Sequence, residues 1–477
     1  MNKSNHKLTK EEKLQQKKKR KSKILAIVLA FVLAVAVIGG GAYLLVYNLF
    51  FSESAVIRKD IKENTLEENP DGASLESSGE RDGDYTYAVY SDGSATLSYY
   101  WGGESDLSVP DTVGGYPVKT IGWRCFSNKT DLKKISLPQS VKYFEKYAFE
   151  NSGIEEIVIP ETNTVIKEGT FINCKSLKSV TLPDTVTEIE TGAFYCCIAL
   201  ESVDFSTSLT KIGSFAFSSC TSLKSADLPE GLTAIDEKAF AVCYALSSIT
   251  LPESLETIGS YCFSECTSLT EMVIPSKIKE LPEALFNNCS ALKRVTMPEG
   301  LEKIGLSAFY YCESLVSAPI PQSVKEMGDY VFCHCIALDG TRLPAGLEKL
   351  GGYVFADCNS LTEMYIPEAI TEIPMYLYAS CTSLKSIDIP ETVTKIGDYA
   401  FTNSDTVKRV TIPDSVESIG LCAFAGSDNL LSIEVPSSVL TIGEGAFVDC
   451  PKLVLRCSKT SFAWEYAETY DVSAEEK

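Results

Sequence analysis

One motif recurs along almost the whole chain at a nearly constant spacing. Each copy centres on an aromatic residue, and the copy from Ala239 to Phe263 reads AFAVCYALSSITLPESLETIGSYCF. The aromatic anchors are Phe126, Phe149, Phe171, Phe194, Phe217, Phe240, Phe263, Phe286, Phe309, Phe332, Phe355, Tyr378, Phe401, Phe424 and Phe447. Thirteen of the fourteen intervals between them are 23 residues long, and the interval between Phe149 and Phe171 is 22. Self-similarity at such a period is the signature of a solenoid, whose stacked units share one elongated core. The sequence therefore predicts about fifteen stacked rungs, where the length of 477 residues alone would suggest about three globular domains.

The residues within one copy predict short strands joined by turns. Ile249 is expected to point into the core and Ser248 and Thr250 outward, because side chains alternate along a strand. A second extended segment ends at Ile258, and we expect Gly259 to permit a tight turn after it. The predicted fold class is a mostly β solenoid with short helical turns, in which equivalent strands of neighbouring rungs pair in parallel sheets.

Most of the seventeen cysteines occupy one position of the repeat, three residues after the aromatic anchor. These eleven are Cys174, Cys197, Cys220, Cys243, Cys266, Cys289, Cys312, Cys335, Cys358, Cys381 and Cys450. Neighbouring rungs lie ~4.8 Å apart, which is wide for the ~3.8 Å between the Cβ atoms of a disulfide. We therefore predict a column of unpaired, buried thiols, with a disulfide framework as the alternative.

The amino-terminal end predicts a membrane anchor. Residues 1–23 contain ten Lys or Arg and two acidic residues, and residues 24–47 contain no charge. About twenty apolar residues span a bilayer, and flanking basic residues remain on the cytoplasmic side. We predict a single transmembrane signal anchor at 24–51, with the amino terminus in the cytoplasm. A cleaved signal peptide is the alternative, since residues 39–41 are glycines, but its apolar core would be shorter.

Composition and local patterns divide the rest of the chain. The strand–turn–strand pattern around Asp92 and Gly93 predicts a hairpin, and Ser461 is placed to cap a helix after the last rung. The predicted divisions are a cytoplasmic basic tail (1–23), the anchor (24–51), a disordered acidic stalk (52–84), an amino-terminal cap (85–117), the repeats (118–457), and a carboxyl-terminal cap and tail (458–477).

The repeat resembles the BspA-type bacterial leucine-rich repeat. The segment from Cys174 to Leu177 (CKSL) and the segment from Val180 to Pro183 (VTLP) match its pattern closely. The resemblance covers about residues 85–470, and fifteen copies in phase make it specific. It implies a right-handed solenoid and, for many members, a cell-surface protein that binds host or neighbouring-cell ligands.

Charge and histidine content argue against nucleic-acid binding and catalysis. The net charge is −21, and because residues 1–23 carry +8, the remainder carries −29 and repels phosphates. His334 is the one histidine beyond the predicted cytoplasmic tail. Together with its neighbours Cys333 and Cys335, His334 would supply three ligands, one fewer than a closed zinc site needs. We therefore interpret His334 as a turn residue. The sequence predicts no catalytic, cofactor or metal site and no enzyme.

Charged and aromatic residues interrupt the Ser and Thr that dominate the outward positions of the first strands. They are Lys134, Glu156, Glu271, Arg294, Arg342, Glu363, Tyr365 and Arg409. Repeat proteins bind large partners on such extended faces. We predict an extracellular, membrane-anchored protein that binds a protein or glycan, with adhesion to host or neighbouring cells as its role. An envelope scaffold with a partner in the same cell is the alternative, and a surface enzyme is a weaker one.

Pro319 and the segment 340–342 fall where strand centres are expected and should interrupt strand pairing between neighbouring rungs.

Overall fold

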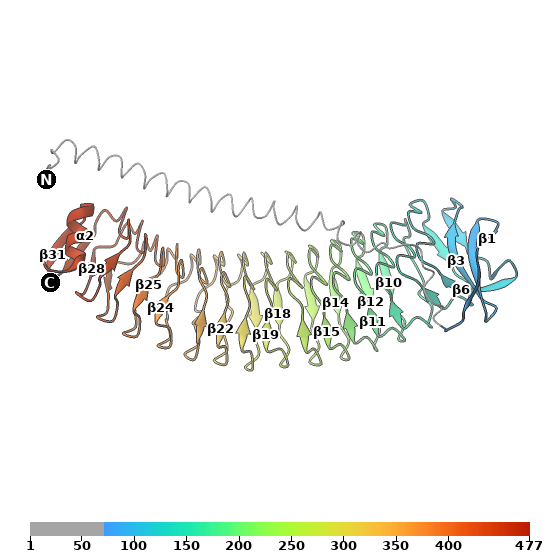
Figure 1. The fold of residues 1–477 in the computed structure, drawn as a ribbon, viewed down its shortest axis with the longest axis horizontal. Coiled ribbons are helices and arrows are strands. Elements are labelled where there is room, and N and C mark those ends of the chain that lie inside the picture. Colours follow the sequence, from blue (N-terminus) through green and yellow to red (C-terminus); the bar gives the residue numbers. More distant parts are fainter. Residues whose placement is uncertain (1–70) are drawn as a thin grey trace, which may run out of the picture. The chain divides into compact units, whose positions relative to one another are not determined.

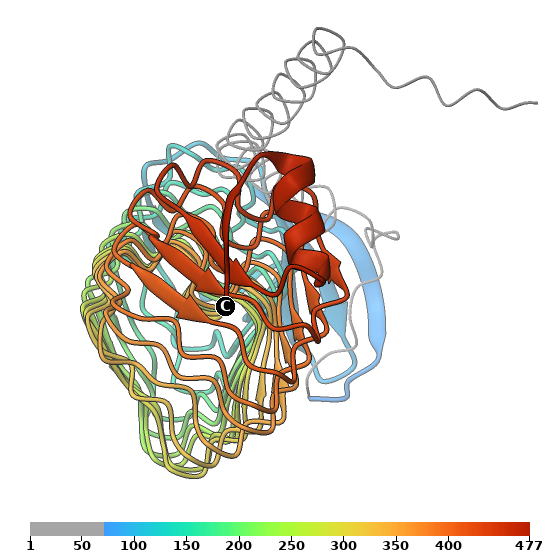
Figure 2. The same cartoon turned by 90° about the vertical axis from the view of Figure 1, so that its left-hand side faces the viewer.

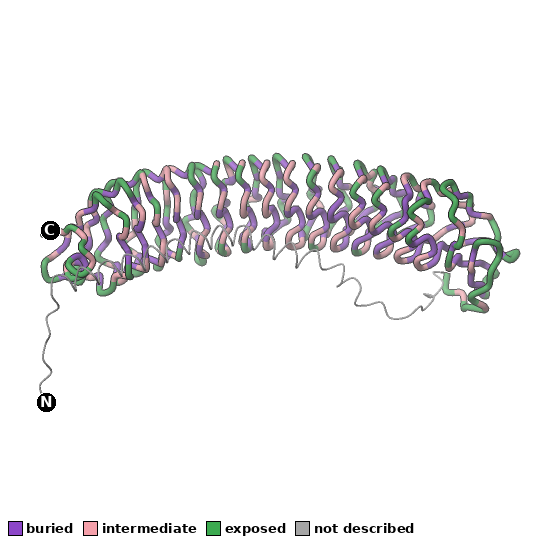
Figure 3. Tube along the Cα trace, turned by 90° about the horizontal axis from the view of Figure 1, so that it is seen from above, coloured by how far each residue is buried: buried purple, intermediate pink, exposed green. Residues whose placement is uncertain are grey.

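The computed structural model describes residues 71–477, which belong to one compact unit, Glu68–Lys477. Within this range the chain forms a stack of mostly β rungs that follow one another in sequence order (Figure 1). Viewed along the stack, successive rungs superimpose (Figure 2), and buried residues run along its inside from end to end (Figure 3). No helix within 71–477 is long and apolar enough to cross a membrane. The predicted tail at 1–23 and anchor at 24–51 lie outside the described residues.

The first strand of each rung has the inward and outward alternation that the sequence predicts. In β16 (Ser248–Thr250) the middle residue, Ile249, is buried and its two neighbours are exposed. The strand pairs in parallel with β14 (Ser225–Asp227), with each residue opposite its repeat equivalent. The other strands of this series are β4 (Asp106–Ser108), β7 (Lys134–Ser136), β10 (Ser179–Thr181), β12 (Ser202–Asp204), β18 (Glu271–Val273), β20 (Arg294–Thr296), β26 (Arg409–Thr411), β28 (Ser432–Glu434) and β30 (Val454–Cys457).

A second series of short strands forms the other set of parallel ladders. In β17 (Thr257–Ile258) the Ile258 side chain is buried, and the strand pairs with β15 (Ala234–Ile235). The rest of this series is β6 (Tyr116–Ile121), β8 (Tyr143–Phe144), β9 (Val165–Ile166), β11 (Glu188–Ile189), β13 (Lys211–Ile212), β19 (Glu280–Leu281), β21 (Lys303–Ile304), β22 (Glu326–Met327), β23 (Lys349–Leu350), β24 (Glu372–Ile373), β25 (Lys395–Ile396), β27 (Ser418–Ile419) and β29 (Thr441–Ile442). The prediction of two extended segments is confirmed in the rungs that contain a strand of each series.

Tight turns carry the aromatic anchor of each rung into the core. Around Phe217, the residues two before and two after it, Phe215 and Ser219, have left-handed φ values of 58° and 62°. The backbone N–H of Phe217 donates to the carbonyl of Ala239 in the next rung at 2.8 Å, and Ser219 donates to Ala241 at 2.8 Å. A left-handed conformation is unfavourable for residues with a side chain. The hydrogen bonds between rungs hold these residues in it, so the turn is as repetitive as the strands.

The anchors and the cysteines form two continuous internal columns. The rings of neighbouring anchors stack with centroids 5.1–6.2 Å apart and planes inclined by no more than 19°. All eleven cysteines of the repeat position are free, and each Sγ donates to the carbonyl oxygen of the preceding rung's anchor at 3.1–3.3 Å. The thiols therefore fill space and also satisfy buried carbonyl groups.

The amino-terminal end of the stack is covered by an antiparallel hairpin. β2 (Tyr85–Tyr90) and β3 (Ala95–Tyr100) pair around the predicted turn. β3 then pairs in parallel with β6, and β6 pairs with β8, so the cap sheet continues into the second series of rung strands. β5 (Thr112–Val113) adds to β6 on its other side.

The prediction of a disordered stalk at 52–84 is wrong at its carboxyl end. β1 (Leu75–Asp82) is a strand that pairs antiparallel with β2. Its side chains are mostly exposed, so no apolar pattern marks it in the sequence. Backbone hydrogen bonds to the edge of the cap sheet order this segment without a buried apolar face.

The carboxyl-terminal end is closed by a helix and one more strand. α2 (Phe462–Tyr470) begins after Ser461, whose side chain accepts a hydrogen bond from the Trp464 N–H, as the sequence predicted. Its Tyr466 is buried with its ring 5.7 Å from that of Phe447 at an angle of 88°, which covers the end of the aromatic column. β31 (Ser473–Glu476) pairs in parallel with β30.

Gly259 has a different role from the one predicted. The left-handed residue of this turn is Tyr261, with φ 58°, and Gly259 is not in that conformation. A Cβ at Gly259 would lie 2.2 Å from the backbone nitrogen of Glu237 in the preceding rung. Glycine is needed here because two rungs approach closely.

We expect Gly259→Ala to lower the free energy of unfolding by about 1–3 kcal/mol, because the added methyl group must push two rungs apart. Gly231→Ala is the matched control. A Cβ there would meet its nearest atom, the Leu209 carbonyl oxygen, at 3.5 Å. Urea denaturation followed by circular dichroism measures both variants, and equal stabilities would contradict the close-approach explanation.

Candidate functional site

The eight outward residues singled out in the sequence are all exposed, on the face formed by the first strands of the rungs. These residues are Lys134, Glu156, Glu271, Arg294, Arg342, Glu363, Tyr365 and Arg409. They do not form one continuous group. Glu271 and Arg294 lie opposite each other on neighbouring strands, and Arg342 forms an ion pair with Glu363. Two of the predicted cations are therefore next to acidic partners on the adjacent rung.

Strand pairing on this face is divided at several places, and the longest stretch without a strand lies in the carboxyl-terminal half. β20 continues only through a single bridge between Arg294 and Ser317, and no strand of this series forms again before β26. The predicted interruption at Pro319 is confirmed, and the physical reason is that proline has no N–H to donate to the ladder. Within the interruption, the buried Tyr378 hydroxyl donates to the Tyr365 carbonyl oxygen at 3.3 Å.

A basic cluster lies where pairing resumes. Lys385, Lys408 and Arg409 line a hollow of about 490 Å³ together with Thr406. The backbone holds these residues in place, since Lys385 N–H donates to the Thr362 carbonyl at 3.1 Å and Thr406 Oγ1 donates to the Thr382 carbonyl at 3.1 Å. All three basic side chains are exposed. We call Lys385, Lys408 and Arg409 the basic cluster.

The basic cluster differs from the charge pattern elsewhere on the same side of the stack. At the repeat position of Lys385 and Lys408, earlier rungs pair opposite charges, as in Lys178–Glu155 at 2.7 Å. Between residues 71 and 477, no carboxylate oxygen lies within 4.0 Å of a basic-cluster nitrogen. Like charges on neighbouring strands are unfavourable. An anion bound in the hollow would relieve their repulsion.

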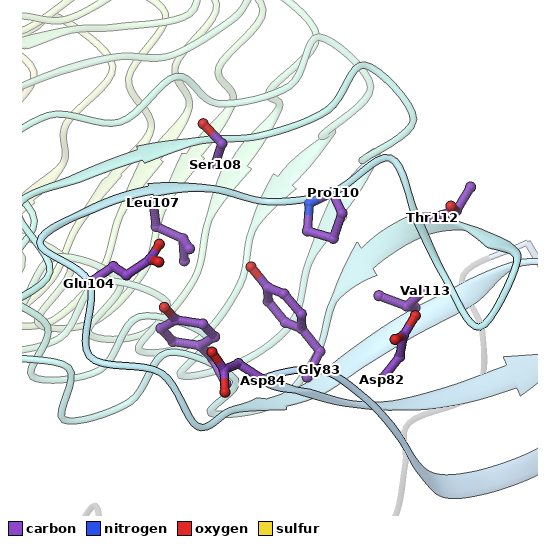
Figure 4. Close-up of a pocket in the computed structure, with 11 residues that line it drawn as sticks. Asp82, Gly83, Asp84, Glu104, Leu107, Ser108, Pro110, Thr112 and Val113 are labelled. Carbon is purple, nitrogen blue, oxygen red and sulfur yellow. The ribbon is translucent and has the colours of Figure 1, made fainter.

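A second hollow, of about 360 Å³, lies in the amino-terminal cap (Figure 4). Its lining includes the carboxylates of Asp82, Asp84 and Glu104 and the rings of Tyr85 and Tyr100. Burial raises the pKa of Tyr85 above its usual range, and nearby carboxylates add to the shift. This hollow would repel anions and could accept only a cationic or neutral group.

Comparison with known families identifies the repeat. The family model described as BspA type leucine rich repeat region, with six copies, matches residues 106–224, 144–269, 210–339 and 325–454. These matches together cover well over half of the chain. The chain belongs to the BspA-type leucine-rich repeat family. No curated protein matches it.

Solved structures of bacterial repeat proteins are similar to this BspA-type chain. A leucine-rich repeat protein from Bacteroides ovatus is similar at 26% identity with a TM-score of 0.69, covering 83% of this chain and 99% of that one. A leucine rich cell surface protein from Faecalibacterium prausnitzii is 26% identical with a TM-score of 0.44, covering 83% of this chain and 98% of its own. The first of these supports the solenoid fold of the BspA-type chain.

The BspA-type repeat of this chain also carries a tyrosine column that the sequence analysis missed. Tyr330, Tyr353, Tyr376 and Tyr399 each lie two residues before an anchor, and their rings stack with centroids 4.3–4.5 Å apart. Burial raises the pKa of both Tyr353 and Tyr399 to about 12. The column runs through consecutive rungs in which first-series strands are missing, so ring stacking connects these rungs. Its signal was visible as one residue type repeated every 23 positions.

Proposed function

We propose that this BspA-type protein binds an anionic extracellular partner, a protein or a glycan, through the basic cluster. The observation that carries the proposal is the set of three exposed cations, Lys385, Lys408 and Arg409, that line a hollow and form no ion pair with a carboxylate among the described residues. The rest of the body is strongly acidic, so a partner's anions would be attracted to the basic cluster.

Location at the cell surface is part of the same proposal. The uncharged run at residues 24–47 follows a basic tail, which supports a membrane anchor at 24–51 with the repeats outside the cell. A binding role without catalysis fits a repeat family in which neighbouring rungs present an extended face. Adhesion to a host or neighbouring cell is the activity that such an arrangement would supply.

The double charge reversal Lys385→Glu with Lys408→Glu tests the site. We expect the full-length protein to bind a sulfated polysaccharide such as heparin, used as an anionic probe, and the variant to bind it at least about tenfold more weakly. The affinity of the unaltered protein should fall as salt is added, because the contacts are exposed. Surface plasmon resonance at two salt concentrations measures both effects.

Lys303→Glu with Lys349→Glu is the matched control, because it changes the net charge equally. Lys303 is partly exposed and Lys349 is exposed, and they already pair with Glu280 at 2.6 Å and Glu326 at 2.5 Å. Equal weakening in both double variants would show only a net-charge effect and would contradict the proposed site. A second arm with polyglutamate in place of heparin distinguishes an acidic protein segment from an anionic glycan.

A further inference from the structure

Three side chains with metal-binding groups meet at one turn of the stack. Cys333 and His334 follow the anchor of one rung, and Asp357 comes from the next rung. The thiol, the imidazole and the carboxylate each offer an atom within 4.8 Å of the other two. The His334 Nε2 and Asp357 Oδ2 atoms are 3.4 Å apart.

The backbone fixes this arrangement. His334 and Asp357 occupy the same repeat position, two residues after an anchor, with left-handed φ values of 61° and 59°. The N–H of His334 donates to the Ala356 carbonyl at 2.9 Å, and that of Asp357 donates to Ala379 at 2.8 Å. The two side chains are therefore stacked by the repeat itself.

The surroundings orient the imidazole and leave it accessible. The ring of Tyr311 stacks on that of His334 with centroids 4.2 Å apart, and Tyr310 packs edge-on at 6.0 Å. The side chains of His334 and Asp357 are 24% and 31% exposed, so a small ion can reach them from solvent. Cys333 forms the inner wall at 4% exposure.

The two cysteines beside His334 are not equivalent. Cys335 belongs to the internal column, where its Sγ donates to the Phe309 carbonyl at 3.1 Å. Among the described residues the Cys333 thiol has no such hydrogen bond. The sequence offered Cys335 as the third ligand, but the structure supplies Asp357 instead, from 23 residues further along.

We propose that Cys333, His334 and Asp357 bind a divalent transition-metal ion such as Zn²⁺. Thiolate, imidazole and carboxylate are the ligand types of zinc sites, and three protein ligands leave a fourth position for water or an outside group. Bond lengths of about 2.0–2.3 Å place tetrahedral ligands roughly 3.3–3.8 Å apart. The ligand atoms now lie up to 4.8 Å apart, and rotation of the partly exposed Asp357 and His334 side chains would bring them to these shorter separations.

Co²⁺ titration of the reduced full-length protein tests the site. We expect one equivalent to bind with a thiolate-to-cobalt absorption band in the near ultraviolet. Cys333→Ser should abolish that band, and His334→Ala and Asp357→Asn should each weaken binding at least about tenfold. Added Zn²⁺ should displace the cobalt and erase the band.

Cys196→Ser is the control, because Cys196 is a partly exposed turn cysteine that does not belong to the cluster. In its own rung it occupies the repeat position of His334 and Asp357, two residues after an anchor. It should leave the titration unchanged. A band that survives Cys333→Ser, or binding without any thiolate band, would overturn the proposal. Circular dichroism of each variant separates loss of the site from loss of the fold.

Discussion

A Phe240→Ala variant is expected to lose about 3–5 kcal/mol of unfolding free energy. Phe240 is fully buried in the middle of the aromatic column, with its ring centroid 5.3 Å from that of Phe217 and 5.9 Å from that of Phe263. Neighbouring rungs are stabilised mainly by contacts with each other. Removing one ring therefore weakens two interfaces and should also uncouple the two halves of the stack.

Guanidinium denaturation followed by circular dichroism measures this loss, and the uncoupling should broaden the transition or divide it in two. Tyr244→Ala is the control, since Tyr244 lies in the same rung but is 37% exposed. Its expected change is within about 0.5 kcal/mol. If both variants unfold at the same denaturant concentration, the column does not carry the stability assigned to it.

The repetitive parts of the fold were predictable from the sequence because each depends on one rung position. A residue type that returns every 23 positions must form a column once the rungs stack, as the anchors and the cysteines do. The inward direction of the Ile249 side chain and the interruption of strand pairing at Pro319 follow from local chemistry alone. Gly259 was explained wrongly because its constraint comes from the backbone of the preceding rung, which the pattern within one rung does not reveal.

The candidate sites were less predictable because they depend on which residues become neighbours across rungs. Arg409 was singled out, but Lys385 and Lys408 were not, since their significance depends on two adjacent rungs that bring these lysines to one hollow. His334 was interpreted as a turn residue, and it does lie in a turn. Adding the repeat period of 23 residues to position 334 gives position 357, which would have linked Asp357 to His334. β1 gave no signal at all, because a strand paired at a sheet edge with both faces exposed needs no apolar pattern.

The Cys174 and Cys450 thiols are expected to be alkylated about 2,000-fold and about 200-fold more slowly, respectively, in the folded protein than in unfolded protein at pH 8. Burial raises the pKa of the Cys174 thiol to about 12 and that of the Cys450 thiol to about 11. Thiolate is the reacting species, and an unperturbed thiol has a pKa of about 8.5. At pH 8 about a quarter of an unperturbed thiol is ionised, so the thiolate fraction alone lowers the rate about 2,000-fold for Cys174 and about 200-fold for Cys450.

Iodoacetamide labelling followed by peptide mass spectrometry measures the order in which the cysteines react. Cys450 is partly exposed and should be labelled before Cys174, which is fully buried. Unfolding without a reductant should then expose all seventeen thiols, because none is paired in the structure. Fewer than seventeen labels would mean that disulfides bridge neighbouring rungs, which the hydrogen bonds from each Sγ to an anchor carbonyl argue against. Rapid labelling of Cys174 in the native state would instead show that the rungs separate readily, and the stack would be held together less tightly than its ring and thiol columns indicate.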